Sequence, residues 1–117
     1  MKTFVFTYGT LKKGFSNNVL LASSEFIQEA VTQPKYKLYD CGHYPCMVKS
    51  KKGEAIHGEI YAVDDITLKR LDRLEGVPFL YERGEIELQN FDKPTIAYFY
   101  QRDVGSFVEC GSSWPRK

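Results

Sequence analysis

The feature that most limits the fold of this 117-residue chain is its succession of short strand-like runs with little helical pattern between them. β-branched and aromatic residues fill these runs, and glycine, proline or polar turn residues separate them. The expected strands cover residues 4–8, 26–31, 36–39, 44–48, 55–63, 81–88 and 95–101. Because strands and helices do not alternate, we expect an antiparallel or mixed sheet that curls toward a barrel.

Only one segment carries a strong helical pattern. Leucines recur at helical spacing over residues 66–75, and Asp64 or Asp65 can cap the start of the helix. Gly76 offers a left-handed C-cap, and Pro78 prevents the helix from continuing. The sequence therefore predicts an amphipathic helix that ends at Glu75.

Three smaller signals complete the predicted outline. The polar start signal at residues 16–18 and the apolar run 19–22 predict a second, shorter helix. Gly58, inside an expected strand, predicts a bulge or a close approach of another chain segment. Residues 90–94 predict a hairpin turn before the last long strand. No repeat or linker interrupts this order, so we expect a single domain over residues 1–117.

Charge and cysteine content exclude several classes of function. Hydrophobic residues make up 43% of the chain, enough for a core, and a net charge of +1 argues against a dedicated nucleic-acid binder. No run reaches the ~18 apolar residues of a membrane span, and no cleavage site follows the first apolar run. The three cysteines, Cys41, Cys46 and Cys110, follow no disulfide framework, so we expect a reducing cytoplasm as the compartment.

The segment Tyr8-Gly9-Thr10-Leu11 is the first candidate site. A strand that ends in glycine and a small hydroxyl residue leaves consecutive backbone N–H groups where the strand stops pairing. Such groups are fixed dipoles that can hold a carboxylate or a developing oxyanion, and glycine lets a ligand approach the backbone closely. The alternative is a tight turn after an edge strand.

Glu75 is the second candidate. It lies four residues after Leu71 and seven after Leu68, so it shares the apolar face of the predicted helix. A buried carboxylate without a close cation has a raised pKa, which suits a general base or acid at neutral pH. The alternative is a glutamate at the helix end that turns toward solvent.

Cys41, His43 and Cys46 form a third, weaker candidate. Their spacing allows a metal site, but no second pair of ligands follows at a matching distance. A cysteine nucleophile paired with His43 or His57 stays open as well. These residues define one of the alternative hypotheses, a cysteine- or metal-dependent enzyme.

Taken together, these motifs resemble the γ-glutamylcyclotransferase-like (AIG2-like) family. The matching features are the YG[ST]L loop at residues 8–11, the L-x-x-x-E-G-x-P segment at residues 71–78 and the Y-x-R start of the next strand at residues 81–83. Supporting matches occur at residues 42–45, 57–61 and 98–100. The resemblance spans nearly the whole chain.

The resemblance implies an α+β fold, a small mixed β-barrel with flanking helices. It also implies an enzyme that releases 5-oxoproline and a free amine or amino acid from a γ-glutamyl amide, without a cofactor or metal. Glu75 would be the general base and acid, and Tyr8, Gly9, Thr10 and Leu11 would bind the small-molecule substrate. Tyr81 and Tyr100 are candidates for the pocket wall or, equally, core residues.

The partners expected from the resemblance are few. We expect a γ-glutamyl substrate, no nucleic acid, no membrane, and a monomer or homodimer. The main alternative is a non-catalytic small-molecule binding module on the same fold.

Overall fold

The computed structural model describes residues 2–115. Most of the regular structure in this range is β-strand, with one α-helix and one 3₁₀ helix. In chain order the elements are β1 (Thr3–Thr7), the 3₁₀ helix η1 (Ser16–Leu21), β2 (Glu25–Thr32), β3 (Tyr36–Asp40), β4 (Pro45–Lys49), β5 (His57–Val63), α1 (Asp65–Leu74), β6 (Tyr81–Glu85), β7 (Leu88–Gln89), β8 (Thr95–Tyr100) and β9 (Val108–Glu109). Among residues 2–115, no helix has the length and apolar character needed to cross a membrane.

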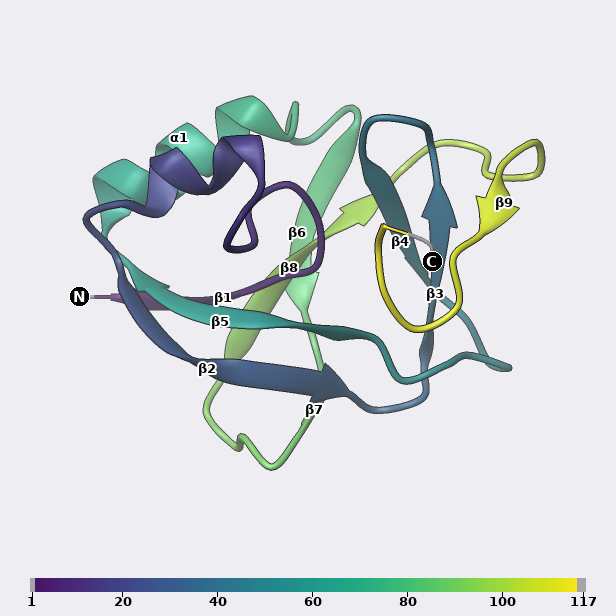
Figure 1. The fold of residues 1–117 in the computed structure, drawn as a ribbon, viewed down its shortest axis with the longest axis horizontal. Helices are drawn as coiled ribbons and strands as arrows, with labels where there is room; N and C mark the ends of the chain where they lie inside the picture. Colours follow the sequence, from purple (N-terminus) through teal and green to yellow (C-terminus); the bar gives the residue numbers. More distant parts are fainter. Residues whose placement is uncertain (1, 116–117) are drawn as a thin grey trace.

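The strands form two sheets. The larger sheet has the order β6-β8-β1-β5-β2-β7, and the smaller has the order β4-β3-β9. In the larger sheet β1 and β8 pair in parallel, whereas the other four neighbouring pairs of strands are antiparallel. Figure 1 shows α1 and η1 side by side along one side of this curled sheet, with the small sheet standing next to it. The predicted α+β fold with a mixed, barrel-like sheet is confirmed.

Both faces of strand β1 are covered by other elements, so β1 lies at the centre of the molecule. Successive side chains of a strand point to opposite faces. Val5 packs in one apolar cluster with Leu71 of α1, and Phe6 packs in the other with Leu38 and Met47 of the small sheet. All five side chains are buried. This double cover fixes the end of β1, where the first candidate site begins.

Helix α1 begins and ends as predicted. The Asp64 carboxylate accepts a hydrogen bond from the Thr67 N–H at 2.7 Å, which is an N-cap contact. Gly76 follows the helix with a φ of 64°, a conformation that favours glycine. Glu75 is therefore held at the last position before a fixed turn.

Three sequence-based predictions were wrong in detail. The predicted strand 81–88 divides into β6, which pairs with β8, and β7, which pairs with β2. The predicted helix at residues 19–22 is the 3₁₀ helix η1, which begins at Ser16. A strand near the C-terminus, β9, was missed because only two residues pair there. The close approach predicted at Gly58 is confirmed, since a Cβ at this position would collide with the Thr7 carbonyl oxygen and the Phe6 ring.

Candidate active site

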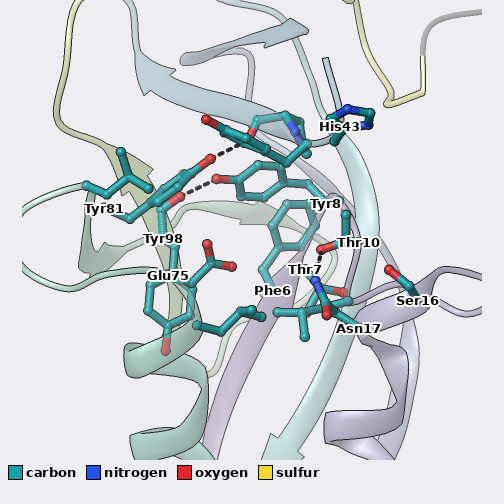
Figure 2. A pocket seen from close by; sticks show the side chains of 16 residues that line it. Phe6, Thr7, Tyr8, Thr10, Ser16, Asn17, His43, Glu75, Tyr81 and Tyr98 are labelled. Atoms are coloured by element: carbon teal, nitrogen blue, oxygen red, sulfur yellow. Dashed lines mark hydrogen bonds between the residues drawn. The ribbon is translucent and has the colours of Figure 1, made fainter. Parts of the chain in front are cut away.

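Three segments that are distant in sequence meet around one cavity of about 370 Å³. They are the loop after β1, the C-terminal end of α1 with the turn that follows, and the loop between β3 and β4 (Figure 2). Buried side chains such as Phe6 and Tyr81 form its interior, whereas Ser16 and His43 are exposed at its rim. A volume of this size fits a small ligand.

The predicted loop at residues 8–11, here called the amide loop, lines the cavity with all four of its residues. Within residues 2–115, the backbone N–H groups of Gly9, Thr10 and Leu11 donate to no protein oxygen. They are therefore available to an anionic or carbonyl oxygen of a bound molecule. This is the property that the sequence predicts for the loop.

Neighbouring polar groups fix the shape of the amide loop. The Asn17 side-chain amide donates to the Thr10 hydroxyl at 2.8 Å, and the Asn17 backbone N–H donates to the Thr10 carbonyl at 3.1 Å. The Asn18 side-chain amide donates to the Leu11 carbonyl at 2.7 Å. Helix η1 thus holds the loop from one side, so its N–H groups are ordered before a ligand binds.

Gly9 is required for a reason that the sequence did not reveal. A Cβ at this position would lie 2.5 Å from Cγ and 2.7 Å from Cδ of Pro45. A proline at the start of β4 therefore approaches the Gly9 backbone closely. Gly9 joins the two walls of the cavity by direct packing.

Glu75 points from the end of α1 into the cavity (Figure 2). Its backbone N–H donates to the Leu71 carbonyl at 2.9 Å, which continues the helical pattern. Within residues 2–115, no ion pair or hydrogen bond reaches its carboxylate. Burial raises the pKa of Glu75 to about 7. The predicted carboxylate thus lies in the cavity, where it is partly buried, and it can exchange a proton near neutral pH.

Tyrosines line the cavity beside Glu75. The Tyr8 hydroxyl donates to the Tyr98 carbonyl, and the Tyr81 hydroxyl donates to the Pro45 carbonyl at 2.7 Å. The Tyr98 hydroxyl donates to the Asp72 carboxylate at 2.8 Å. Burial raises the pKa of all three phenols, so they stay neutral. Their hydroxyls hold elements together, and their rings form the wall.

The structure places the two tyrosines proposed for the wall differently. Tyr81 lines the cavity, whereas Tyr100 does not. Tyr100 is the cross-strand partner of Tyr81, and its ring packs against the Tyr81 and Phe107 rings at centroid distances of 5.3 and 6.3 Å. Tyr98, on the same strand and the same face, is the lining residue instead. Strand alternation identifies a face, but it does not identify which residue of that face reaches the cavity.

The expectation that the cysteines form no disulfide was wrong. Cys41 and Cys46 are bonded to each other across the β3–β4 loop. The β3–β4 register, in which Asp40 is paired with Pro45, brings the two side chains together. In this oxidised form neither sulfur is a thiolate, so neither can serve as the metal ligand or the nucleophile considered above. Among residues 2–115, no cluster of three or more His, Cys, Asp or Glu side chains is placed to hold a metal ion.

Several lining residues were not singled out from the sequence as site residues. They are mainly Phe6, Thr7, Ser16, Asn17, Leu74, Leu80 and Tyr98. Asn17 was interpreted only as part of a helix-start signal, although its side chain supports the amide loop. A polar side chain directly after a glycine-containing loop is the only local signal for that role.

Comparison with known proteins agrees with this geometry. The sequence model of the family described as "Gamma-glutamyl cyclotransferase, AIG2-like" matches residues 5–115. A gamma-glutamylcyclotransferase homologue of Vibrio cholerae is 46% identical over 87 residues, 74% of each chain. A homologue of Methanocaldococcus jannaschii is 39% identical over 112 residues, 92% of each chain.

A crystal structure also shares this fold. The structure of a mouse AIG2-like protein superposes with a TM-score of 0.79 at 26% identity and covers 97% of this chain and 88% of its own. The match over residues 5–115 includes the amide loop, Glu75 and the β3–β4 loop. The chain belongs to the gamma-glutamyl cyclotransferase, AIG2-like family.

Proposed function

We propose that this protein is a γ-glutamyl cyclotransferase that converts a γ-glutamyl amide into 5-oxoproline and a free amine or amino acid. One observation carries the proposal. A partly buried carboxylate with a pKa of about 7, Glu75, lines the same cavity as three backbone N–H groups that have no partner within residues 2–115. Family membership supports the reaction type.

The amide loop holds the γ-glutamyl group and its reacting carbonyl. The N–H groups of Gly9, Thr10 and Leu11 donate to the carbonyl oxygen as negative charge develops on it. The loop is already shaped by Asn17 and Asn18, so little reorganisation accompanies the reaction. The enclosed cavity holds the substrate in a folded conformation with its α-nitrogen against the carbonyl carbon.

Glu75 moves one proton. As a carboxylate it removes a proton from the substrate α-ammonium, and the resulting amine attacks the γ-carbonyl carbon. A new carbon–nitrogen bond closes the five-membered ring. The protonated Glu75 then gives its proton to the leaving nitrogen, and the original amide bond breaks. The ring nitrogen, which still carries two protons after the attack, loses one of them to the released amine, so the products are 5-oxoproline with a neutral ring nitrogen and an ammonium ion. A pKa of about 7 suits both steps, because the carboxyl group gains and loses the proton with similar ease.

The size of these effects is sufficient for catalysis. Holding the amine and carbonyl in a near-attack geometry supplies about 7–11 kcal/mol in favourable cases. General acid–base assistance contributes roughly 10²–10⁴-fold. The nucleophile belongs to the substrate, so the chemistry needs neither a nucleophilic side chain nor a metal or organic cofactor.

The test is a 5-oxoproline assay with Glu75→Gln, across a panel of γ-glutamyl-amino acids and γ-glutamyl-alkylamines. Glutamine keeps the shape of the side chain but cannot accept the proton, so kcat is expected to fall by about 10²–10⁴-fold. Glu82→Gln is the matched control, because Glu82 is exposed on β6 and outside the cavity. Its turnover is expected to equal that of the wild type.

Other outcomes would change the proposal. Normal turnover by Glu75→Gln would show that another group moves the proton. If calorimetry detects binding of γ-glutamyl compounds but no 5-oxoproline forms, the protein is the non-catalytic binding module instead.

A further inference from the structure

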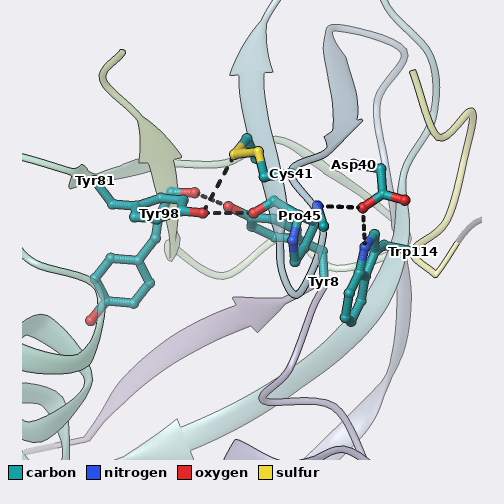
Figure 3. Close-up of a disulfide and its surroundings, with 9 residues drawn as sticks. Tyr8, Asp40, Cys41, Pro45, Tyr81, Tyr98 and Trp114 are labelled. Carbon is teal, nitrogen blue, oxygen red and sulfur yellow. Dashed lines mark hydrogen bonds between the residues drawn. A yellow bond between two sulfur atoms is a disulfide. The ribbon is translucent and has the colours of Figure 1, made fainter. Parts of the chain in front are cut away.

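The segment between β3 and β4, together with the first residue of β4, forms the other wall of the cavity. We call residues 41–46 the hairpin loop. His43, Tyr44 and Pro45 line the cavity. A disulfide joins Cys41 and Cys46, the residues on either side of residues 42–45 (Figure 3). The proposed chemistry makes no use of this bond.

We propose that the Cys41–Cys46 disulfide is a redox modification site, and that its reduction by low-molecular-weight thiols loosens the hairpin loop and weakens substrate binding. The kinetic part of this inference rests on the function proposed above. The partner is a thiol, and the response is a change in substrate affinity.

The short span of the disulfide argues against a mainly structural role. Cys41 and Cys46 are five residues apart. Closing so short a loop removes little conformational entropy from the unfolded chain, so the bond adds less stability than a long-range disulfide would.

The two cysteine residues differ in burial. Cys46 is fully buried, whereas Cys41 is only partly buried. A thiolate from solvent can therefore reach Cys41, forming a mixed disulfide there and releasing Cys46 as the leaving thiolate. A second small thiol then attacks the mixed disulfide. Two electrons enter the protein, both cysteines become thiols, and the two small thiols leave as one oxidised disulfide.

The Cys46 end of the loop keeps its contacts after reduction. The Pro45 carbonyl accepts a hydrogen bond from the Tyr81 hydroxyl at 2.7 Å, and the Pro45 ring packs against Gly9. The Cys46 sulfur lies 3.7 Å from the Tyr81 hydroxyl, so the new thiol has a polar neighbour. This half of the loop belongs to the rigid part of the site.

The Cys41 end has weaker support. The Cys41 N–H donates to the Tyr44 carbonyl at 3.0 Å, and the Gly42 N–H donates to the Asp40 carboxylate at 2.8 Å. His43 and Tyr44 are exposed, so solvent competes for these contacts. Without the disulfide, His43 and Tyr44 gain freedom at the rim of the cavity, while Glu75 and the amide loop stay in place. Reduction should therefore raise KM more than it lowers kcat.

The experiment compares air-oxidised protein with protein reduced by a phosphine, which leaves no thiol adduct. Alkylation and intact-mass measurement count the thiols in each state. We expect two additional alkylated cysteines after reduction, a three- to tenfold higher KM for a γ-glutamyl amide, and a kcat within twofold. Cys41→Ser is expected to show the higher KM with or without phosphine. Cys110→Ser, which leaves the disulfide intact, should respond as the wild type does.

Trp114 gives a second readout that does not depend on turnover. It is the single tryptophan of the chain, and its indole N–H lies 3.4 Å from the carboxylate of Asp40, the residue next to Cys41 (Figure 3). Reduction should shift its fluorescence in the wild type and in Cys110→Ser, but not in Cys41→Ser.

The outcomes separate the two proposals. Equal KM values in both redox states, or a Cys41→Ser variant that still responds to phosphine, would overturn the redox inference and leave the cyclotransferase function standing. If neither state releases 5-oxoproline, the proposed function is wrong. Calorimetric Kd values for a γ-glutamyl amide then replace KM, and equal Kd values in the two states would overturn the redox inference as well.

Discussion

The two walls of the cavity are held by different kinds of interaction. The amide loop and Glu75 follow β1 and α1, whose apolar residues are buried against each other. Asn17 and Asn18 donate hydrogen bonds to the amide loop, and the Asp64 carboxylate accepts one at the start of α1. The hairpin loop is exposed at His43 and is closed by one covalent bond. The first wall depends on folding alone, whereas the second also depends on the redox state of the solution.

This difference matches the division of tasks that we propose. Groups that stabilise charge or move a proton must keep their positions to within a fraction of an ångström, and secondary-structure ends provide such positions. A rim that admits substrate and releases products tolerates motion. A covalent bond that solution thiols can break is therefore placed where loosening affects binding rather than chemistry.

We call the amide loop and Glu75 together the rigid wall. The largest expected effect tests how much free energy of unfolding the protein loses by holding the Glu75 carboxylate in this wall. The burial that raises the pKa of Glu75 to about 7 also destabilises the folded protein when the carboxylate is ionised. Glu75 loses its proton near pH 4.5 in the unfolded chain and near pH 7 in the folded chain. The free energy of unfolding is therefore highest below pH 4.5 and falls as the pH rises to 7. At about 1.4 kcal/mol per pKa unit, the loss is roughly 3 kcal/mol.

Glu75→Gln removes this ionisation. Urea unfolding should find the variant more stable than the wild type by roughly 3 kcal/mol at pH 8, and about equal to it at pH 4. Glu82→Gln, on the exposed surface, should change stability by less than about 0.5 kcal/mol at either pH. Equal stabilities of Glu75→Gln and wild type at pH 8 would show that the carboxylate is not destabilised by burial.

The second prediction concerns the contact between the two walls, which Gly9 and Pro45 make. Gly9→Ala places a methyl group against the Pro45 ring, so either the amide loop or the hairpin loop must move. A displacement of about 1 Å can cost roughly 10²-fold in rate, and kcat/KM is expected to fall by about that factor. Pro45→Ala removes the colliding atoms. The kcat/KM of the double variant is therefore expected to be at least about tenfold higher than that of Gly9→Ala alone.

Gly105→Ala is the matched glycine control. The atoms nearest to a Cβ there belong to the Asp103 carboxylate, at 3.3 Å, and the position lies outside the cavity. Its kcat/KM should stay within about twofold of the wild type. If Pro45→Ala gave Gly9→Ala no recovery, the two walls would not be coupled through this contact.

The same two regions differ in how far the sequence predicted them. Gly76 and the leucine spacing located Glu75 correctly because capping and periodicity are local properties. The disulfide was missed because it depends on the register of β3 and β4, in which Tyr39 pairs with Cys46. Turn and strand signals locate a hairpin to within a few residues, and a shift of one residue separates the two sulfurs.

The misplaced tyrosine has a similar cause. Tyr98 and Tyr100 have the same alternation and the same residue type, so the sequence does not distinguish them. Pairing with β6 decides between them, because it places Tyr100 opposite Tyr81 and leaves Tyr98 at the cavity. Non-local pairing therefore sets the parts of the site that local patterns miss.

The smallest expected effect tests how the rigid wall is held. Asn17→Ala removes the hydrogen bond from the Asn17 side chain to the Thr10 hydroxyl but keeps the backbone bond from Asn17 to the Thr10 carbonyl. One partly buried hydrogen bond contributes about 1 kcal/mol, so thermal unfolding should show a loss of that size. Because the amide loop gains some freedom, kcat/KM is expected to fall about three- to tenfold.

In a double-mutant cycle, Thr10→Val should add little to Asn17→Ala, since both remove the same bond. An unchanged kcat/KM in Asn17→Ala would show that the backbone bond alone orders the loop, and additive losses would assign Thr10 a separate contact with the substrate.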